Sequence, residues 1–381
     1  MEMFKCLLPS GVEFGAGKIN TLDDALQDGP ILLLTDRGVA SSGVASRVKE
    51  RCLANSGEVH AFMDAPPEPS EDQVAGVVDE LSGLNIRNIV ALGGGSVMDM
   101  AKLAAVMLGG GPSMAELFDG RLPRNRAVRL IMIPTTAGAG AEATPNAIVY
   151  RPSQRLKVGI VCDAFMPDRV ILDPELITGL PAAITASTGM DALCHALECY
   201  ISNKANPLSD MLAVEAVRLI FKSLRKSYAD GADLQARADM LLASFYAGIC
   251  IACSGTNGVH ALSYPLGGRY RIAHGVSNAV LLAPVFAANK EACASKLAGI
   301  APLCGKNLDG KSDGEKADAF VLALEELSRD LGIPARLSEL GVPAEDLEEI
   351  VDAALQVKRL LDNNPKTLTR DDIRSIYQSI L

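Results

Sequence analysis

The arrangement of short apolar runs and longer amphipathic segments constrains the fold of this 381-residue chain most strongly. Up to residue 181, runs rich in Ile, Leu and Val alternate with helical patterns, which is typical of βαβ units around a parallel sheet. The segments that predict helices are 39–54, 70–84 and 96–107. The runs that predict strands are 31–35, 58–62, 88–92, 128–133, 147–150, 156–161 and 169–172, of which the last three either complete the sheet or include a hairpin.

Beyond Pro181 the pattern changes to long Ala- and Leu-rich helical stretches, with few strand signals over 182–304. Residues 315–331, 343–361 and 370–380 also predict helices. A chain of this length is typical of two domains. We therefore expect an α/β domain with a Rossmann-like parallel sheet over 1–181 and an all-helical domain over 182–381.

Composition excludes several classes of function. The net charge is −10 without a basic block, and aromatic residues make up 4% of the chain, with no Trp. We therefore expect no binding of nucleic acid or of an anionic membrane surface. The longest apolar runs, such as 279–288, fall short of the ~18 residues that a membrane-spanning helix needs, so we expect no such helix.

The nine cysteines are scattered and odd in number, which argues against a disulfide framework and favours a reducing, cytoplasmic location. The first residues lack the pattern of a signal peptide, which favours the same location. Cys250 and Cys253 have the spacing of a redox or zinc pair. Because they lie in an apolar helical stretch without a second pair, we interpret them as packing residues.

A Gly-Gly-Gly-Ser turn at Gly93 to Ser96 joins a predicted strand to a predicted helix. Glycines such as Gly94 and Gly95 allow the backbone to approach a phosphate closely, and a helix N-terminus attracts a diphosphate. We expect Ser96 to cap the new helix. The turn lacks the full GxGxxG pattern, so the alternative is a tight strand–helix turn without a ligand.

Two other strand ends carry residues that suit a cofactor. Asp36 follows the strand 31–35, where a carboxylate accepts hydrogen bonds from ribose hydroxyls and repels a 2′-phosphate, which favours NAD over NADP. The alternative is that Asp36 caps the next helix. The segment that begins Pro134-Thr135-Thr136 is rich in small and hydroxyl-bearing residues, which suits a loop beside a cofactor, although alone it indicates only a loop.

Three of the four histidines lie in the helical half of the chain. Asp191 and His195 are four residues apart in a helical stretch, so both lie on one helix face. Pro265 and two glycines separate His260 from His274, so we expect these two on separate elements that converge. One carboxylate and three imidazoles suit Fe(II), Zn(II), Mn(II) or Co(II) and leave a position for a substrate oxygen. The alternative is a simple Asp–His hydrogen bond within the helix.

Other polar residues carry weaker signals. His60 falls in the α/β half with no partner expected, and we interpret it as an ordinary core or surface histidine. Arg269 and Arg271 lie between two of the other histidines and would favour an anionic substrate. We prefer to interpret them as surface or interface arginines.

With these patterns together, the chain resembles the iron-containing (group III) alcohol dehydrogenases. The resemblance runs from about residue 8 to the last residues of the chain, with the motifs in family order and at family spacing. The matching segments are GGGSVMDMAK (93–102), PTTAGAGAEATPNAIV (134–149), GMDALCHALECYIS (189–202), HALSYPLGGRYRIAHGVSNAVLL (260–282) and NNPKTLTRDDIRSIYQ (363–378).

The resemblance implies a dehydroquinate-synthase-like architecture, with a dinucleotide-binding domain, a helical domain and an active site in the cleft between them. It implies NAD and a divalent metal, Fe(II) before Zn(II), and a homodimer or higher homo-oligomer. By motif position, the implied metal ligands are Asp191, His195, His260 and His274. The residues implied to line the cofactor are Asp36, Gly94, Gly95, Ser96, Asp99, Thr135, Thr136, Asn146 and Lys157.

The implied activity is reversible oxidation of a small alcohol to an aldehyde. A metal would polarise the substrate oxygen, and a hydride would pass between the substrate carbon and C4 of nicotinamide. We expect Tyr264 and His274 to be the catalytic residues. Tyr264 stands where the family often has a histidine, and a phenol with its usual pKa near 10 is a poor base, so ribose hydroxyls and water are an alternative proton route. The rival functions are a metal-independent reductase, an NAD-using lyase on the same fold, and a non-catalytic NAD-binding scaffold.

Overall fold

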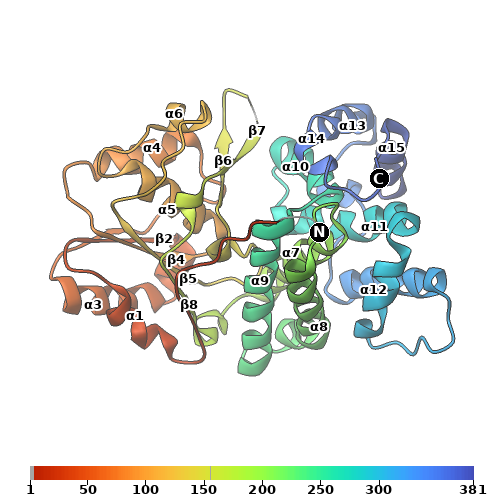
Figure 1. Ribbon diagram of the computed structural model, residues 1–381, viewed down its shortest axis with the longest axis horizontal. Helices are drawn as coiled ribbons and strands as arrows, with labels where there is room; N and C mark the ends of the chain where they lie inside the picture. Colours follow the sequence, from red (N-terminus) through yellow and green to blue (C-terminus); the bar gives the residue numbers. More distant parts are fainter. Residues whose placement is uncertain (1–3, 155) are drawn as a thin grey trace. The chain divides into compact units, whose positions relative to one another are not determined.

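The computed structural model describes residues 4–154 and 156–381. Within them the chain divides into an α/β unit, Cys6–Leu180, and a helical unit that takes in Pro181–Leu381. Figure 1 shows the strands confined to the first unit and long helices in the second. The predicted fold class, an α/β unit with a parallel sheet followed by a helical region, is confirmed.

The described part of the α/β unit holds a sheet of six strands in the order β1-β8-β5-β4-β2-β3, with every neighbouring pair parallel. A separate antiparallel hairpin pairs β6 with β7. The strands are β1 (Val12–Phe14), β2 (Ile31–Thr35), β3 (Val59–Phe62), β4 (Asn88–Gly93), β5 (Arg129–Pro134), β6 (Asn146–Arg151), β7 (Leu156–Val161) and β8 (Arg169–Leu172).

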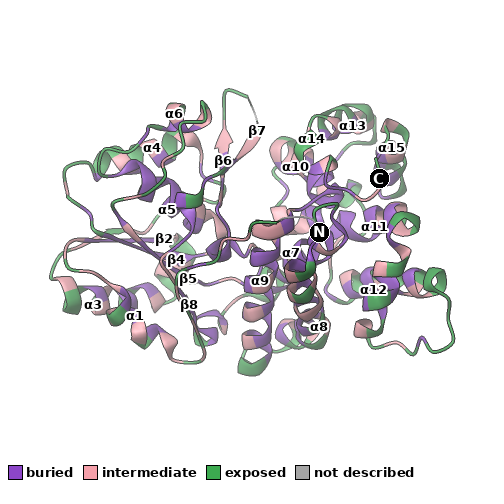
Figure 2. Ribbon diagram, in the orientation of Figure 1, coloured by how far each residue is buried: buried purple, intermediate pink, exposed green. Residues whose placement is uncertain are grey.

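Both faces of this sheet are buried, which explains why its central strands are continuous apolar runs. In β2, Leu32 and Leu34 point into one core while Ile31 and Leu33 point into the other, and β4 and β5 alternate in the same way. The helices of this unit are α1 (Leu22–Ala25), α2 (Arg37–Ser41), α3 (Val44–Ser56), α4 (Glu71–Glu80), α5 (Gly95–Met107) and α6 (Met114–Phe118). Figure 2 shows α5 mostly buried, as expected for the helix that follows the central strand.

The helical unit is built from long helices that pack on one another. α7, α8 and α9 form one packed group, and α11 packs against both α7 and α12. The helices are α7 (Ala182–Ile201), α8 (Pro207–Ala229), α9 (Leu234–Ser254), α10 (Gly258–Tyr270), α11 (His274–Ile300), α12 (Asp313–Asp330), α13 (Leu347–Leu355), α14 (Lys358–Leu361) and α15 (Arg370–Ser379).

Several elements differ from the sequence expectation. The predicted helix 39–54 is two helices, because the chain breaks at Ser42 and at Gly43, whose φ is 81°. The predicted helix 343–361 is likewise divided into α13 and α14. The expectation that no segment could span a membrane by length and composition was wrong for α9. Two charged residues interrupt its apolar pattern without ending the helix, and 67% of its most apolar window is buried inside the protein, as in a core helix.

Candidate metal centre and cofactor loops

Helix α7 carries the first two candidate ligands. Asp191 and His195 lie one turn apart, with His195 Nε2 3.8 Å from Asp191 Oδ1. Each residue is 5% exposed. Asp191 and His195 share their buried helix face with Glu198, and most other buried positions of α7 are Ala, Leu, Met or Cys.

The other two candidate ligands come from α10 and α11. His260 is the third residue of α10, and His274 is the first residue of α11. The prediction that they lie on separate elements is confirmed, but the expected break was misplaced. α10 continues through Pro265 and both glycines to Tyr270, and the chain turns at Arg271, whose φ is 55°.

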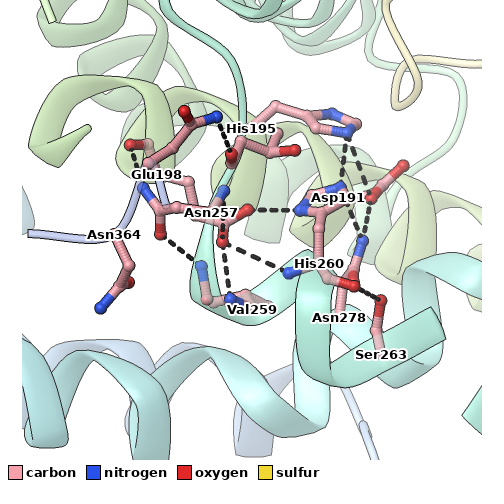
Figure 3. A network of polar contacts seen from close by, with 12 residues as sticks. Asp191, His195, Glu198, Asn257, Val259, His260, Ser263, Asn278 and Asn364 are labelled. Atoms are coloured by element: carbon pink, nitrogen blue, oxygen red, sulfur yellow. Dashed lines mark hydrogen bonds and ion pairs between the residues drawn. The ribbon is translucent and has the colours of Figure 1, made fainter. Parts of the chain in front are cut away.

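These four side chains converge on one point (Figure 3). The candidate ligand atoms of Asp191, His195, His260 and His274 all lie within 4.8 Å of one another. His260 Nε2 is 2.9 Å from His195 Nε2, and His274 Nε2 is 3.8 Å from Asp191 Oδ1. The sequence-predicted ligand residues are therefore brought together in the folded chain.

Exposure is uneven around this cluster. The side chains of Asp191 and His195 are each 6% exposed and that of His260 is 4% exposed, whereas that of His274 is 36% exposed. The Tyr264 ring lies 6.3 Å from the His274 ring, measured between centroids. His274 and Tyr264, the two predicted catalytic residues, therefore lie next to each other on the accessible side of the cluster.

The donor set fits a divalent metal. Three imidazole nitrogens and one carboxylate oxygen are ligands typical of Fe(II), Zn(II), Mn(II) and Co(II). Asn278, on α11, adds a second indication. Its Nδ2 is 2.7 Å from Asp191 Oδ1, 3.1 Å from His260 Nε2 and 3.2 Å from His274 Nε2, while its buried Oδ1 has no hydrogen-bond partner. An unpaired buried oxygen beside clustered ligand atoms is costly in the protein alone, which favours a cation at this point.

Neighbouring groups in the cluster favour the charged forms of Asp191 and His260. Burial opposes the ionised form of Asp191, but the surrounding imidazoles of His195, His274 and His260 outweigh it and lower the pKa of Asp191. Burial likewise opposes a charged His260, but the Glu198 carboxylate outweighs it and raises the pKa of His260. Neither Glu198 nor Asn278 was singled out from the sequence.

The loops of the α/β unit bring several predicted cofactor residues together. A methyl group at Gly94 would lie 3.1 Å from Thr136 Oγ1, and one at Gly95 would lie 2.9 Å from Ala139 Cβ. The Thr135 N–H donates to the carbonyl of Gly93 at 3.0 Å. The turn after β4 and the loop after β5 are therefore packed side by side, with only glycine fitting at the start of α5.

Two of the predicted cofactor residues, Ser96 and Asp36, have hydrogen-bond roles that differ from the first expectation. Ser96 does not cap α5, because the helix begins at Gly95 with Gly94 as its N-cap. The Ser96 hydroxyl instead accepts a hydrogen bond from the N–H of Glu68 at 3.0 Å. Asp36 caps α2, since its Oδ1 accepts from the N–H of Val39 at 3.0 Å. The helix-cap alternative for Asp36 is therefore observed, and its second carboxylate oxygen is not used in the cap.

Glu68 is a further residue that the sequence did not reveal. It has a φ of 52°, donates its N–H to Ser96 and forms an ion pair with Lys157 on β7. Its conformation is rare for a side chain larger than glycine. Glu68 therefore links two of the predicted cofactor residues, one from the turn after β4 and one from the hairpin.

The remaining predicted cofactor residues surround a buried lysine. Lys102, on α5, donates to the carbonyl of Asn146 at 2.6 Å and to Thr144 Oγ1 at 2.9 Å, and lies 3.9 Å from Asp99 Oδ1. Burial lowers the pKa of Lys102 to about 8 and raises the pKa of Asp99 to about 6. Burial also raises the pKa of Glu142 to about 7.

The comparisons with known proteins point to one family. The model of the iron-containing alcohol dehydrogenases matches residues 9–174, and the C-terminal model of the same family matches residues 185–381. This chain belongs to the iron-containing alcohol dehydrogenase family. It is therefore an enzyme, an oxidoreductase that acts on alcohols. The family resemblance based on the five motifs is confirmed.

Three relatives illustrate the match. The chain is 40% identical over 356 residues to long-chain-alcohol dehydrogenase 1 of Geobacillus thermodenitrificans (strain NG80-2), covering 92% of this chain and 89% of that protein. It is 32% identical to an NAD-dependent methanol dehydrogenase of Bacillus methanolicus, with all of both chains covered. The crystal structure of sulfoacetaldehyde reductase from Bifidobacterium kashiwanohense in complex with NAD+ superposes with a TM-score of 0.89 at 30% identity, covering 100% of this chain and 99% of that chain.

Local contacts in the structure explain the weaker sequence signals. Arg269 forms ion pairs with Glu349 and, at 3.2 Å, with Asp346, so it is a paired surface arginine as interpreted. His60 lies on the edge strand β3 with its Nε2 3.0 Å from Glu58 Oε1. Cys250 is buried in α9 and its thiol donates to the carbonyl of Ser209, in agreement with a packing role. Cys253 is disulfide-bonded, so the packing interpretation was wrong for this residue.

Proposed function

We propose that this chain is a metal-dependent, NAD(H)-linked alcohol dehydrogenase that interconverts a small alcohol and its aldehyde. The observation that carries the proposal is the convergence of one carboxylate and three imidazoles within 4.8 Å in the helical unit. Family membership supports alcohol chemistry, and the NAD+ complex of the sulfoacetaldehyde reductase supports NAD as the cofactor.

In this proposal Asp191, His195, His260 and His274 hold the metal, with Fe(II) as the first candidate and Zn(II) as the second. When bound, the metal supplies Lewis-acid polarisation of the substrate oxygen, and NAD supplies the hydride acceptor. The buried ligands Asp191, His195 and His260 keep water from the inner side of the cluster, whereas the half-exposed His274 leaves an approach for the substrate.

The α/β unit holds the cofactor. The glycines at Gly94 and Gly95 leave no side chain between the start of α5 and a diphosphate, and the positive end of the helix attracts that anion. Asp36 lies at the carboxyl end of β2, where its carboxylate accepts from ribose hydroxyls and opposes a 2′-phosphate. Asp99, Thr135, Thr136, Asn146 and Lys157 complete the proposed cofactor-binding set.

Tyr264 is the proposed proton-transfer residue. Its ring centroid lies 6.3 Å from that of His274, the most exposed of the four candidate ligands, and we assign its hydroxyl to take the alcohol proton from a substrate bound on this side. His274 then acts both as a ligand and as the residue that orients this side of the site. A neutral phenol can accept the alcohol proton only while it gives up its own, so in this proposal the Tyr264 proton passes onward to water or to a ribose hydroxyl.

The rival functions have less support. A lyase acting on a carboxylated or phosphorylated substrate would need free arginine or lysine side chains near the ligands, and Arg269 is instead occupied by Glu349 and Asp346. A non-catalytic scaffold would have no reason to bring four ligand side chains together, three of them buried. We further propose a cytoplasmic homodimer that binds neither nucleic acid nor membrane.

The decisive experiment is an anaerobic screen of NADH oxidation with a panel of aldehydes. Purified enzyme is stripped with a chelator and reloaded with Fe(II), Zn(II) or nothing, and NADPH is run beside NADH. We expect turnover that requires metal and NADH and gives stoichiometric alcohol. Equal rates with and without metal would contradict the metal-dependent proposal, and a product other than the alcohol would favour the lyase.

A further inference from the structure

Glu198 is a buried carboxylate that lies next to the candidate metal ligands. It follows His195 by three residues and Asp191 by seven on α7, so all three lie on the same face of that helix. Glu198 is 0% exposed. Figure 3 shows it between α7 and the start of α10, on the side of His260 that faces away from the other ligands.

The two carboxylate oxygens of Glu198 have separate partners. Oε1 accepts from the backbone N–H groups of Asn257 at 3.1 Å, Val259 at 2.6 Å and His260 at 3.3 Å. Oε2 contacts Nδ1 of the His260 ring. Four N–H groups can therefore satisfy this buried charge without a lysine or arginine. Three of them belong to the N-terminus of α10, where a helix favours a negative charge.

The ring of His260 is held in one orientation by these contacts. An ionised carboxylate only accepts hydrogen bonds, so the imidazole nitrogen that faces it carries the proton. The other ring nitrogen, Nε2, then has a free lone pair in the neutral ring. This Nε2 is the atom that faces His195 Nε2 at 2.9 Å and Asn278 Nδ2 at 3.1 Å, within the ligand cluster.

We propose that Glu198 is a positioning residue for the metal. Its carboxylate holds His260 in the tautomer with the proton on Nδ1 and so presents the Nε2 lone pair to the ion. This inference rests on the proposed metal-dependent function. Metal-bound histidines usually donate their second ring N–H to a carboxylate or carbonyl, and loss of that partner weakens metal binding by about 10- to 100-fold. α7 would thus supply two ligands and also the group that orients a third.

The substitution Glu198→Gln separates this role from simple capping of α10. The side-chain oxygen of glutamine can still accept from the backbone N–H groups of Asn257 and Val259. Its NH₂ group then faces His260 Nδ1, because the reverse orientation would direct NH₂ at three N–H donors. A donor at this position requires Nδ1 to accept, which moves the ring proton to Nε2 and blocks the lone pair needed by the metal.

Two measurements test the inference on the full-length protein. The first uses ¹⁵N-histidine labelling and long-range ¹H–¹⁵N correlation spectra of the metal-free protein in mildly alkaline buffer. The chain has only four histidines, so the His260 signals can be assigned by substituting His60, His195 and His274 one at a time. We expect the Nδ1–H tautomer at His260 in the wild type and the Nε2–H tautomer in Glu198→Gln.

The second measurement is Zn(II) affinity by competition with a chromophoric chelator. We expect Glu198→Gln to bind Zn(II) about 10- to 100-fold more weakly than the wild type. Asp239→Asn is the matched control. Asp239 is a buried carboxylate on α9 that contacts Ser223, Lys222 and Gln235 and no candidate ligand, so its substitution should leave the Zn(II) affinity and the His260 tautomer unchanged.

The outcomes separate the inference from the proposed function. An Nε2–H tautomer in the wild type, or equal Zn(II) affinity in the wild type and Glu198→Gln, would overturn the positioning role alone. Failure of the wild type to bind any divalent metal would overturn the proposed function, and the inference with it. The wild-type tautomer can be read even if a Glu198 variant does not fold, so the inference stays open to refutation.

Discussion

Glu142 is a buried carboxyl group that makes the stability of the α/β unit depend on pH. It is 2% exposed, and its Oε1 has no hydrogen-bond partner. Burial raises its pKa from 4.5 to about 7, so between these values the folded chain binds a proton that the unfolded chain has lost. The stabilisation from this proton is complete below about pH 4.5 and is lost as the pH rises through about 7.

We therefore predict that Glu142→Gln flattens the decline in melting temperature between pH 5 and 8. The neutral amide resembles the protonated acid. The free energy of unfolding of the variant, relative to that of the wild type, should therefore increase by about 1–3 kcal/mol as the pH rises. Differential scanning calorimetry across this range measures the effect. Glu80→Gln, an exposed carboxylate on α4, should keep the wild-type slope. A wild-type slope in Glu142→Gln would show that Glu142 is ionised in the fold.

Tyr264 is predicted to affect turnover without affecting metal binding. Tyr264→Phe removes the hydroxyl beside His274, and loss of a general acid or base lowers the rate by about 10²-fold or more. The kcat of alcohol oxidation should fall across the pH profile while Zn(II) affinity stays the same. Tyr270→Phe on the same helix is the control, since its hydroxyl donates to Asp346 and not to the cluster. Unchanged kcat at every pH would remove Tyr264 from the proton path.

The sequence predicted the four residues that converge in the candidate metal centre but not the residues that contact them, for a physical reason. Asp191 and His195 share a helix face at a spacing that can be read from sequence alone. Glu198 has the same local signal as any acidic residue on a helix. Its role depends on α10, whose first residues are about sixty positions later and contact it only in the folded chain. Asn278, on α11, is likewise an ordinary helix residue until three candidate ligands converge on its amide.

At the level of elements, the most specific prediction about NADH binding concerns the glycine turn that precedes α5. A methyl group at Gly95 would lie 2.9 Å from Ala139 Cβ, closer than real side chains pack, so Gly95→Ala must displace one loop. We expect the Kd for NADH to rise at least about 10-fold, because the diphosphate loses a close backbone approach. Fluorescence titration with NADH measures this.

The matched control for that substitution is Gly76→Ala. Gly76 lies in the interior of α4 with nothing within 4 Å of the added methyl group, so the change should stabilise the protein slightly and leave the NADH affinity unchanged. If Gly95→Ala binds NADH as tightly as Gly76→Ala, the turn does not hold the cofactor.

Buried central strands could be predicted from the sequence more readily than exposed edge strands or the positions of turns. The central strands β2, β4 and β5 could be predicted because both sheet faces are buried, which requires unbroken apolar runs. β1 was missed because it is a three-residue edge strand whose outer residues are exposed and leave no such run. Pro265 suggested a helix break, yet α10 continues through it, and the turn comes instead at Arg271.

For the whole molecule, the exposed edge strand β1 leads to a prediction about the oligomeric state. β1 is an edge strand of the six-stranded sheet, and its Val12 and Phe14 are each 41% exposed. Exposed apolar edge strands favour pairing with another chain. We predict a dimer of twice the 40.0 kDa chain mass by light scattering, which Phe14→Lys weakens. Leu53→Lys, an equally exposed apolar position on α3, should leave the dimer intact. A wild-type monomer would contradict this prediction.

We propose that turnover requires one divalent metal, held by Asp191, His195, His260 and His274. The most direct measurement is the metal content of the protein together with its rate of NADH-dependent aldehyde reduction, before and after chelation and after anaerobic reloading with Fe(II). We predict one metal per chain in the active protein, loss of nearly all turnover on stripping, recovery on reloading, and no recovery in His260→Ala. Full turnover by metal-free protein, or recovery in His260→Ala, would show that this metal is not required for the reaction.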